Sequence, residues 1–101
     1  MDLVVKVDNR PKGGQTVIGG DFKEVPGGKG ANQAVAMARL GGNVNMIGKV
    51  GKDGFGETLL NALKNDNVNT KYINQEDIAT GVAMITVDNN AENSIVVAPG
   101  A

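Results

Sequence analysis

The chain has 101 residues, with ten Lys and Arg against eleven Asp and Glu, which gives a formal net charge of −1 at neutral pH. This length allows one domain at most, and the scattered basic residues argue against a nucleic-acid partner or a membrane-surface role. The absence of cysteine and histidine excludes disulfides, zinc–thiolate sites, thiol catalysis and the commonest general base. No signal peptide or apolar run of membrane-spanning length is present, so we expect a cytoplasmic protein.

The N-terminal part of the sequence predicts two strands. Residues 3–7 are rich in valine and read as a short strand that ends in a turn over 8–14. Residues 15–25 read as a second strand, with a break at Gly19-Gly20 that we interpret as a bulge or bend.

A glycine-rich run, Gly27 to Gly30, follows and leads into a helix that we place at residues 31–40. Glycine lets a ligand approach the backbone, and the start of the helix directs free N–H groups and its positive dipole end toward the same loop. Lys29 adds a cation, and Asn32 adds a donor and an acceptor. We interpret the run as a site for a polyhydroxylated or anionic small molecule. A glycine-rich turn without a ligand remains the alternative, because the known phosphate-binding motifs do not match.

The middle of the chain predicts a strand–helix–strand order. Residues 44–50 read as a buried strand, a helix follows near 55–65, and 72–73 form a brief strand. Four apolar side chains of this helix are spaced to share one face: Phe55, Leu59, Ala62 and Leu63. Asp53 stands directly before the helix, and we interpret it as the N-cap.

The end of the chain predicts a β-hairpin. Residues 81–87 and 94–98 are β-rich, and the asparagines between them suit the positive-φ positions that glycine often fills. We expect the strands near the two ends of the chain to pair mostly antiparallel. The strand at 44–50 lies between helices, as in a parallel βαβ layer, so the sequence predicts the α/β fold class.

Several glycine-containing blocks follow one another along the chain. The first is Gly27-Gly28-Lys29-Gly30-Ala31-Asn32-Gln33-Ala34, with Gly41 and Gly51 after it. The second is Val50-Gly51-Lys52-Asp53-Gly54-Phe55-Gly56, and the third joins Thr80-Gly81-Val82-Ala83, Glu92-Asn93-Ser94-Ile95 and Pro99-Gly100-Ala101. In order and spacing, over essentially the whole chain, these blocks resemble the signatures of the ribokinase-like (PfkB) carbohydrate kinases.

The resemblance implies the N-terminal part of a Rossmann-like ribokinase fold together with a small β-sheet lid over the sugar site. We expect a single incomplete domain over 1–101, with lid strands at approximately 3–25 and 80–98 and α/β units at approximately 27–74. Family members are about three times this long. Their ATP-binding half, whose Gly-Ala-Gly-Asp segment carries the catalytic base, has no counterpart in this chain. We therefore expect the first third of a kinase, as a fragment, a truncated gene product or a partial chain.

The resemblance also implies four substrate-binding residues. Asp2 matches the aspartate of the family's Asn-x-Asp sugar motif, although a disordered N-terminal residue is the alternative for this position. Gly28 and Lys29 match the loop that touches sugar hydroxyls, and Asn32 matches the amide that anchors the sugar ring. No catalytic residue and no metal ligand is assigned in this chain.

A complete enzyme of this kind would transfer the γ-phosphate of ATP to a hydroxyl of a sugar, with Mg²⁺ as the metal and ribose as the expected sugar. The ATP and Mg²⁺ sites would lie outside this chain, which we expect to be inactive alone. The family also pairs lids between two subunits, which implies a homodimer. The alternative is a non-catalytic interaction module, in which the β-rich lid pairs subunits and the glycine loop is structural.

Overall fold

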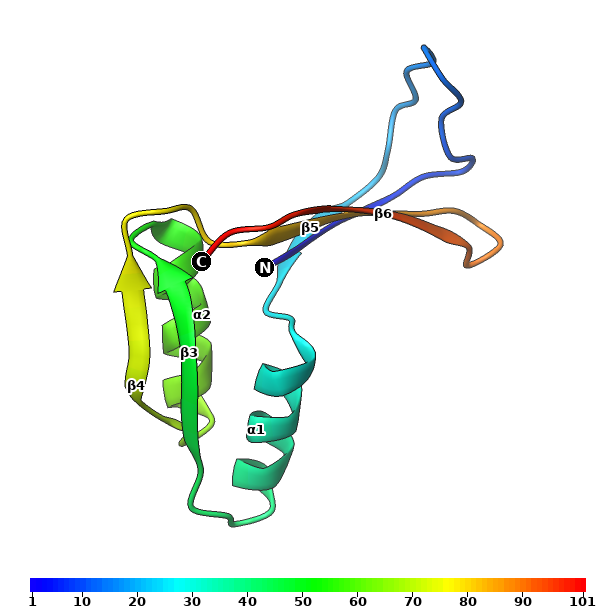
Figure 1. Ribbon diagram of the computed structural model, residues 1–101. Coiled ribbons are helices and arrows are strands. Elements are labelled where there is room, and N and C mark those ends of the chain that lie inside the picture. Colours follow the sequence, from blue (N-terminus) through cyan, green and yellow to red (C-terminus); the bar gives the residue numbers. More distant parts are fainter.

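Four short strands form one sheet from the two ends of the chain. In the computed structural model, which describes residues 1–101, they are β1 (Asp2–Lys6), β2 (Phe22–Val25), β5 (Val82–Val87) and β6 (Asn93–Ala98). Their order is β2-β1-β5-β6, with β1 antiparallel to β2 and parallel to β5. The predicted hairpin of β5 and β6 is confirmed. Figure 1 shows this four-stranded sheet extending away from the helices.

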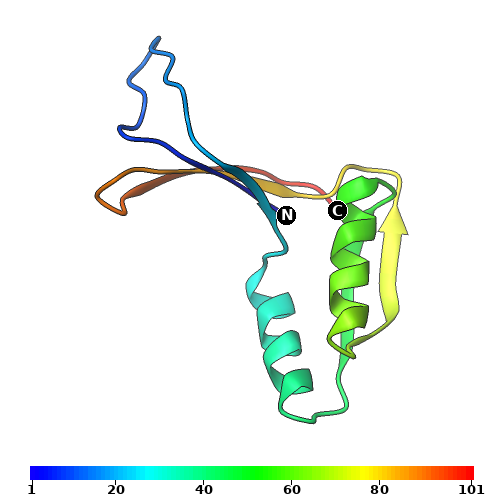
Figure 2. The ribbon, with the colours of Figure 1, turned by 180° about the vertical axis from the view of Figure 1, so that it is seen from behind.

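The remaining elements form a separate α/β unit. It contains α1 (Lys29–Arg39), β3 (Asn45–Gly51), α2 (Gly54–Asn65) and β4 (Asn69–Glu76), and β3 and β4 pair in parallel as the strand–helix–strand pattern predicts. Both helices run alongside the two strands (Figures 1 and 2). The two sheets share no strand, so the α/β unit meets the four-stranded sheet only through connecting segments.

Local signals in the sequence explain where the helices begin and end. The Asp53 carboxylate accepts a hydrogen bond from the backbone N–H of Gly56 at 2.8 Å, so the predicted N-cap of α2 is confirmed. By contrast, α1 begins after Gly28 without a side-chain cap. Gly41 follows α1 with φ of 90°, a conformation that glycine adopts without steric cost.

Two strand predictions fail in their extent. Of the predicted strand over 15–25, only Phe22–Val25 pairs with β1, and the chain before it forms a loop that projects beyond the sheet (Figure 1). Ile18 in this loop is 93% exposed, so its side chain does not hold the loop against the sheet. Conversely, β4 extends over Asn69–Glu76 rather than 72–73, because β3 offers it a partner along most of that length.

The turn between β5 and β6 also differs from its prediction. Ala91, and none of the asparagines there, has a positive φ, of 59°. The Asp88 carboxylate organises the turn by accepting the N–H groups of Asn90 at 2.9 Å and Glu92 at 3.1 Å. Arg10 donates to the same carboxylate at 3.1 Å and to Glu92 at 2.8 Å, so the projecting loop is tied to the turn.

The hydrophobic core of the molecule is small. Its buried cluster consists of Ala34, Leu63 and Val68, with partly buried neighbours from α1, β3 and β4. Ile47 of β3 and Tyr72 of β4 are 84% and 51% exposed, so part of this small sheet is uncovered. No helix is long and apolar enough to cross a membrane.

Candidate functional site

The loop between β2 and α1 touches Asp2 directly. Asp2 begins β1 and pairs with Val25 of β2, two residues before Gly27. A Cβ on Gly27 would collide with the Asp2 carboxylate, lying 2.7 Å from its Cγ and 2.8 Å from Oδ1. Because real Cβ atoms do not approach so closely, only glycine at position 27 allows the carboxylate to lie against the loop.

Asp2 is an ordered residue of the sheet. It stands opposite Val25 on one side and Ala83 of β5 on the other, and it is half-buried. The structure places Asp2 in a strand, whereas the alternative was a disordered N-terminal residue. No lysine or arginine forms an ion pair with its carboxylate, which leaves both oxygens available as acceptors.

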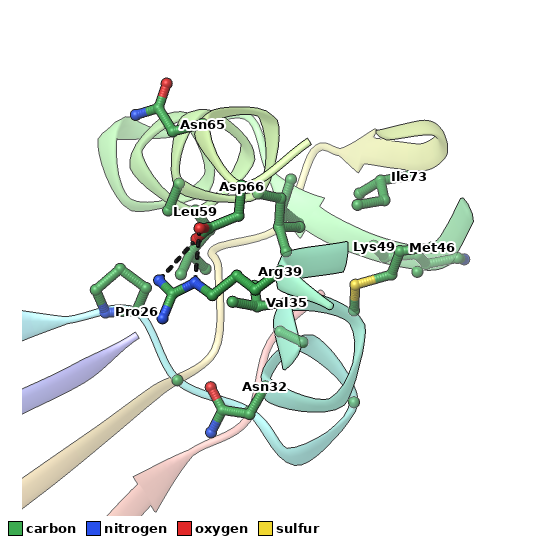
Figure 3. A pocket seen from close by; sticks show the side chains of 18 residues that line it. Pro26, Asn32, Val35, Arg39, Met46, Lys49, Leu59, Asn65, Asp66 and Ile73 are labelled. Atoms are coloured by element: carbon green, nitrogen blue, oxygen red, sulfur yellow. Dashed lines mark hydrogen bonds and ion pairs between the residues drawn. The ribbon is translucent and has the colours of Figure 1, made fainter. Parts of the chain in front are cut away.

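The first turn of α1 supplies the donors beside this carboxylate. Gly28 has φ of 103° and precedes α1 without a capping side chain, and Lys29 and Asn32 are both exposed in the first turn. The backbone N–H of Asn32 donates to Gly28 O at 2.9 Å, which is the first hydrogen bond of the helix. The backbone N–H groups that precede Asn32 in α1 therefore have no acceptor within the helix. In Figure 3 the Asn32 amide projects from α1, away from the Arg39 side chain.

A cavity of about 630 Å³ lies between α1 and α2, and only one end of it belongs to this site. Gly28 and Asn32 line that end, whereas Asp2 and Lys29 are not among the lining residues. Apolar side chains of the helices and strands form much of the wall: Val35, Met46, Leu59, Ala62, Leu63 and Ile73. Such a wall offers a sugar few hydrogen-bond partners. It is typical of a surface that is covered by another part of a protein or by a second protein.

Two other lining residues of the cavity form an ion pair that sequence reasoning missed. Arg39 of α1 donates to Asp66, directly after α2, through two bonds of 2.8 and 3.1 Å (Figure 3). The hydrogen bond from Arg39 lowers the pKa of Asp66 below its ordinary value. The two residues are 27 positions apart in the sequence, and no local pattern connects them.

Asp53 has a second partner besides the helix that it caps. Its Oδ1 accepts the Thr80 hydroxyl at 2.6 Å, and its Oδ2 accepts the Thr80 backbone N–H at 2.8 Å. The Thr80 hydroxyl in turn accepts the backbone N–H of Gly51 at 2.9 Å. These Thr80 bonds, with the N–H of Gly56, hold the pKa of Asp53 below its ordinary value. Thr80 belongs to a recognised sequence block, but its role as a partner of Asp53 was not predicted.

Two lysines near the end of β3 form surface ion pairs. Lys49 contacts Glu76 at 3.2 Å, and Lys52 contacts Asp77 at 2.9 Å. No group of three or more Asp, Glu, His or Cys side chains is placed to hold a metal ion. These residues therefore provide no carboxylate cluster that would hold Mg²⁺ by itself.

Comparison with known proteins confirms this family resemblance over the whole chain. The pfkB family carbohydrate kinases match residues 1–101. The chain is 54% identical to ribokinase of Bacillus subtilis over all of its own length and 34% of that protein.

Solved structures agree with this match. Ribokinase of Thermotoga maritima superposes with a TM-score of 0.90 at 34% identity, over 99% of this chain and 33% of that one. Ribokinase of Arabidopsis thaliana, complexed with ribose and ATP, gives 0.88 at 31% identity over the same shares. The chain thus spans about a third of the length of these relatives. This chain, whose mixed α/β fold is that of the ribokinases, belongs to the pfkB family of carbohydrate kinases.

Proposed function

We propose that this chain is the sugar-binding part of an ATP-dependent, ribokinase-like kinase that phosphorylates a hydroxyl of ribose. The observation that carries the proposal is the unpaired carboxylate of Asp2, held against Gly27 beside the uncapped start of α1. The Arabidopsis relative is complexed with ribose and ATP, which supports this choice of sugar and phosphate donor.

The geometry suits a ligand with neighbouring hydroxyl groups. An ionised carboxylate has two acceptor oxygens, so Asp2 can accept hydrogen bonds from hydroxyls on adjacent carbons of a sugar. The backbone N–H groups at the start of α1 donate to sugar oxygens, and Gly28 lets the ring approach the loop. Asn32 carries both a donor and an acceptor, which matches the dual character of a hydroxyl. Lys29 is exposed in the first turn of α1, where its ammonium group can donate hydrogen bonds to sugar hydroxyls.

Phosphoryl transfer needs groups that this segment does not supply. The reaction requires a bound nucleotide, a metal at its phosphates and a base or positioning residue at the accepting hydroxyl. ATP use follows from the family, and Mg²⁺ is the metal that we expect with it. We assign both, together with the base, to the part of a complete kinase beyond these residues. The isolated segment is then a binding part without catalytic activity, in a cytoplasmic enzyme.

The four-stranded sheet supports a lid role and a subunit contact. Its large exposed side chains include Phe22, Met84, Ile95, Val96 and Val97. Apolar groups in such number on one sheet are typical of a surface that another protein surface covers. We propose that lid strands at about 3–25 and 80–98 close over the sugar, while the α/β units lie at about 27–74, and that two lids pair in a homodimer.

The first prediction tests the sugar site by calorimetry with ribose, in the full-length kinase of which we propose this chain to be a part. Asn32→Ala should weaken ribose binding by roughly 1–3 kcal/mol, because polar partners in the bound state lose their hydrogen bonds. Asp2→Asn should weaken it as well, since one acceptor oxygen becomes a donor.

Two exposed residues away from the site provide matched controls, Asn43→Ala and Glu57→Gln, and both should bind ribose like the unaltered protein. Unchanged affinity in both site variants would contradict the sugar site. Together with a sheet that still pairs subunits, that result would favour the non-catalytic interaction module.

A further inference from the structure

Thr80 provides the hydrogen bonds that join the α/β unit to the four-stranded sheet. It lies in the segment between β4 and β5, whereas its partners Gly51 and Asp53 end β3 and precede α2. Three bonds of 2.6 to 2.9 Å therefore meet at one threonine. The other side-chain contact at this junction is the ion pair of Lys52 with Asp77, which is exposed to solvent and correspondingly weak.

The backbone packs tightly around Thr80. Thr80 itself is only 7% exposed. A Cβ on Gly51 would lie 2.5 Å from the Thr80 nitrogen, and one on Gly56 would lie 3.0 Å from its hydroxyl. A Cβ on Gly100 would lie 2.9 Å from the Thr80 carbonyl carbon. Three glycines thus allow the backbone to pack closely against Thr80. The start of β5, two residues later, is therefore held in place by Thr80.

Backbone hydrogen bonds connect the residues after Thr80 to the start of β1, where Asp2 lies. Gly81, the next residue, accepts a hydrogen bond from the Met1 nitrogen at 3.0 Å, and the N–H of Ala83 donates to Met1 O at 2.9 Å. Ala83 stands opposite Asp2 in the parallel pairing of β1 with β5. The segment that begins at Thr80 therefore holds the Asp2 backbone on one side, and β2 holds it on the other.

The start of α1, which carries Asn32, belongs to the other part of the molecule. Gly27 and Gly28 lead into α1, whose Ala34 packs in the core of the α/β unit with Leu63 of α2. Asp2 and Asn32 thus come from two bodies that share no sheet. The distance between these two side chains depends on how the two bodies are held together.

We propose that Thr80, held by Asp53, is a positioning residue for sugar binding, which sets the Asp2 carboxylate relative to Asn32 at the start of α1. This inference rests on the proposed function, because it concerns the same sugar site. Asp53 then has two roles: its bond to Gly56 N–H begins α2, and its bonds to Thr80 align the four-stranded sheet with the α/β unit. Thr80 touches neither the sugar nor the phosphate and acts through Asp2.

The test compares the KM for ribose with the KM for ATP in the full-length kinase. Thr80→Val removes the hydroxyl and keeps the side-chain shape. It should raise the KM for ribose about tenfold, the effect of a hydrogen bond or two on binding, with the KM for ATP unchanged. Thr80→Ser keeps the hydroxyl and should restore the KM for ribose. Thr58→Val is the matched control, since the Thr58 hydroxyl bonds only to Gly54 O on α2, and it should change neither constant.

Two further variants, Asp53→Asn and Asp2→Asn, separate a failure of the positioning role from a failure of the sugar site. If Thr80→Val does not fold, Asp53→Asn gives the same prediction, because asparagine keeps the acceptor for Gly56 N–H and loses one for Thr80. A lower Tm with an unchanged KM for ribose, or an equal rise of both KM values, would overturn the positioning role. Asp2→Asn is measured beside them. If it loses ribose while neither junction variant moves the KM for ribose, only the positioning role fails; if Asp2→Asn also leaves ribose binding unchanged, the sugar site itself fails.

Discussion

The site depends on single atoms at the residue scale, and Gly27 is the clearest case. A glycine is needed here because the Asp2 carboxylate occupies the space of a Cβ. The sequence motif identified the glycines and matched Asp2 to a sugar aspartate. It could not reveal that the two touch, because they lie 25 positions apart and meet only through the pairing of β1 with β2.

Our second prediction concerns this contact. Gly27→Ala should displace the Asp2 carboxylate and weaken ribose binding at least tenfold in the full-length kinase, which is about 1.4 kcal/mol. Gly13→Ala is the matched control, because a Cβ there meets nothing within 4 Å. Calorimetry with ribose measures both variants. Equal affinity of the Gly27→Ala and Gly13→Ala proteins would mean that the carboxylate position has no bearing on the sugar.

At the scale of elements, local sequence patterns predict both helices, whereas the predicted lengths of β2 and β4 are wrong. The helices α1 and α2 follow from apolar spacing and, for α2, from the Asp53 cap, all of which are local. Strand length depends on a partner, which the sequence does not identify. Residues 15–21 have β-like composition, but only the N–H of Gly20 bonds to β1, at Lys6 O, whereas β4 is long because β3 pairs with it. The parallel pairing of β1 with β5 likewise joins segments from opposite ends of the chain.

A third prediction concerns the pH dependence of the α2 cap. Hydrogen bonds from Thr80 and Gly56 lower the pKa of Asp53 in the folded state below its ordinary value of 3.8. A lowered folded-state pKa stabilises the fold above the unfolded pKa, and this stability is lost as the pH falls through the folded pKa. Unfolding by urea should therefore show a smaller difference between Asp53→Asn and the unaltered kinase at pH 3 than at pH 6. A difference that is constant with pH would contradict a charged cap.

On the scale of the whole molecule, the small size of the chain explains why so much apolar surface is exposed. A chain that spans a third of its relatives builds only a small core, and parts of both sheets remain uncovered. The outer strand β6 presents Ile95, Val96 and Val97 with more than half of each side chain exposed. An edge strand of this kind offers unpaired backbone groups to a second copy.

The fourth prediction is that the 101-residue chain self-associates through these strands. Sedimentation equilibrium at several concentrations should give a dimer or a larger species. Val96→Lys, which places a charge on β6, should shift the equilibrium toward the monomer, whereas Lys64→Glu on α2 should not. A folded monomer throughout the micromolar range would contradict pairing through the four-stranded sheet.

The central claim is that the Asp2 carboxylate and the loop before α1 hold the sugar, and a crystal structure of the full-length kinase with ribose tests it most directly. We predict that both oxygens of Asp2 accept hydrogen bonds from hydroxyls on adjacent carbons, at about 2.5–3.0 Å. Gly28 and Asn32 should contact the same ribose. Ribose bound elsewhere, with the Asp2 carboxylate paired only to protein groups, would contradict the account.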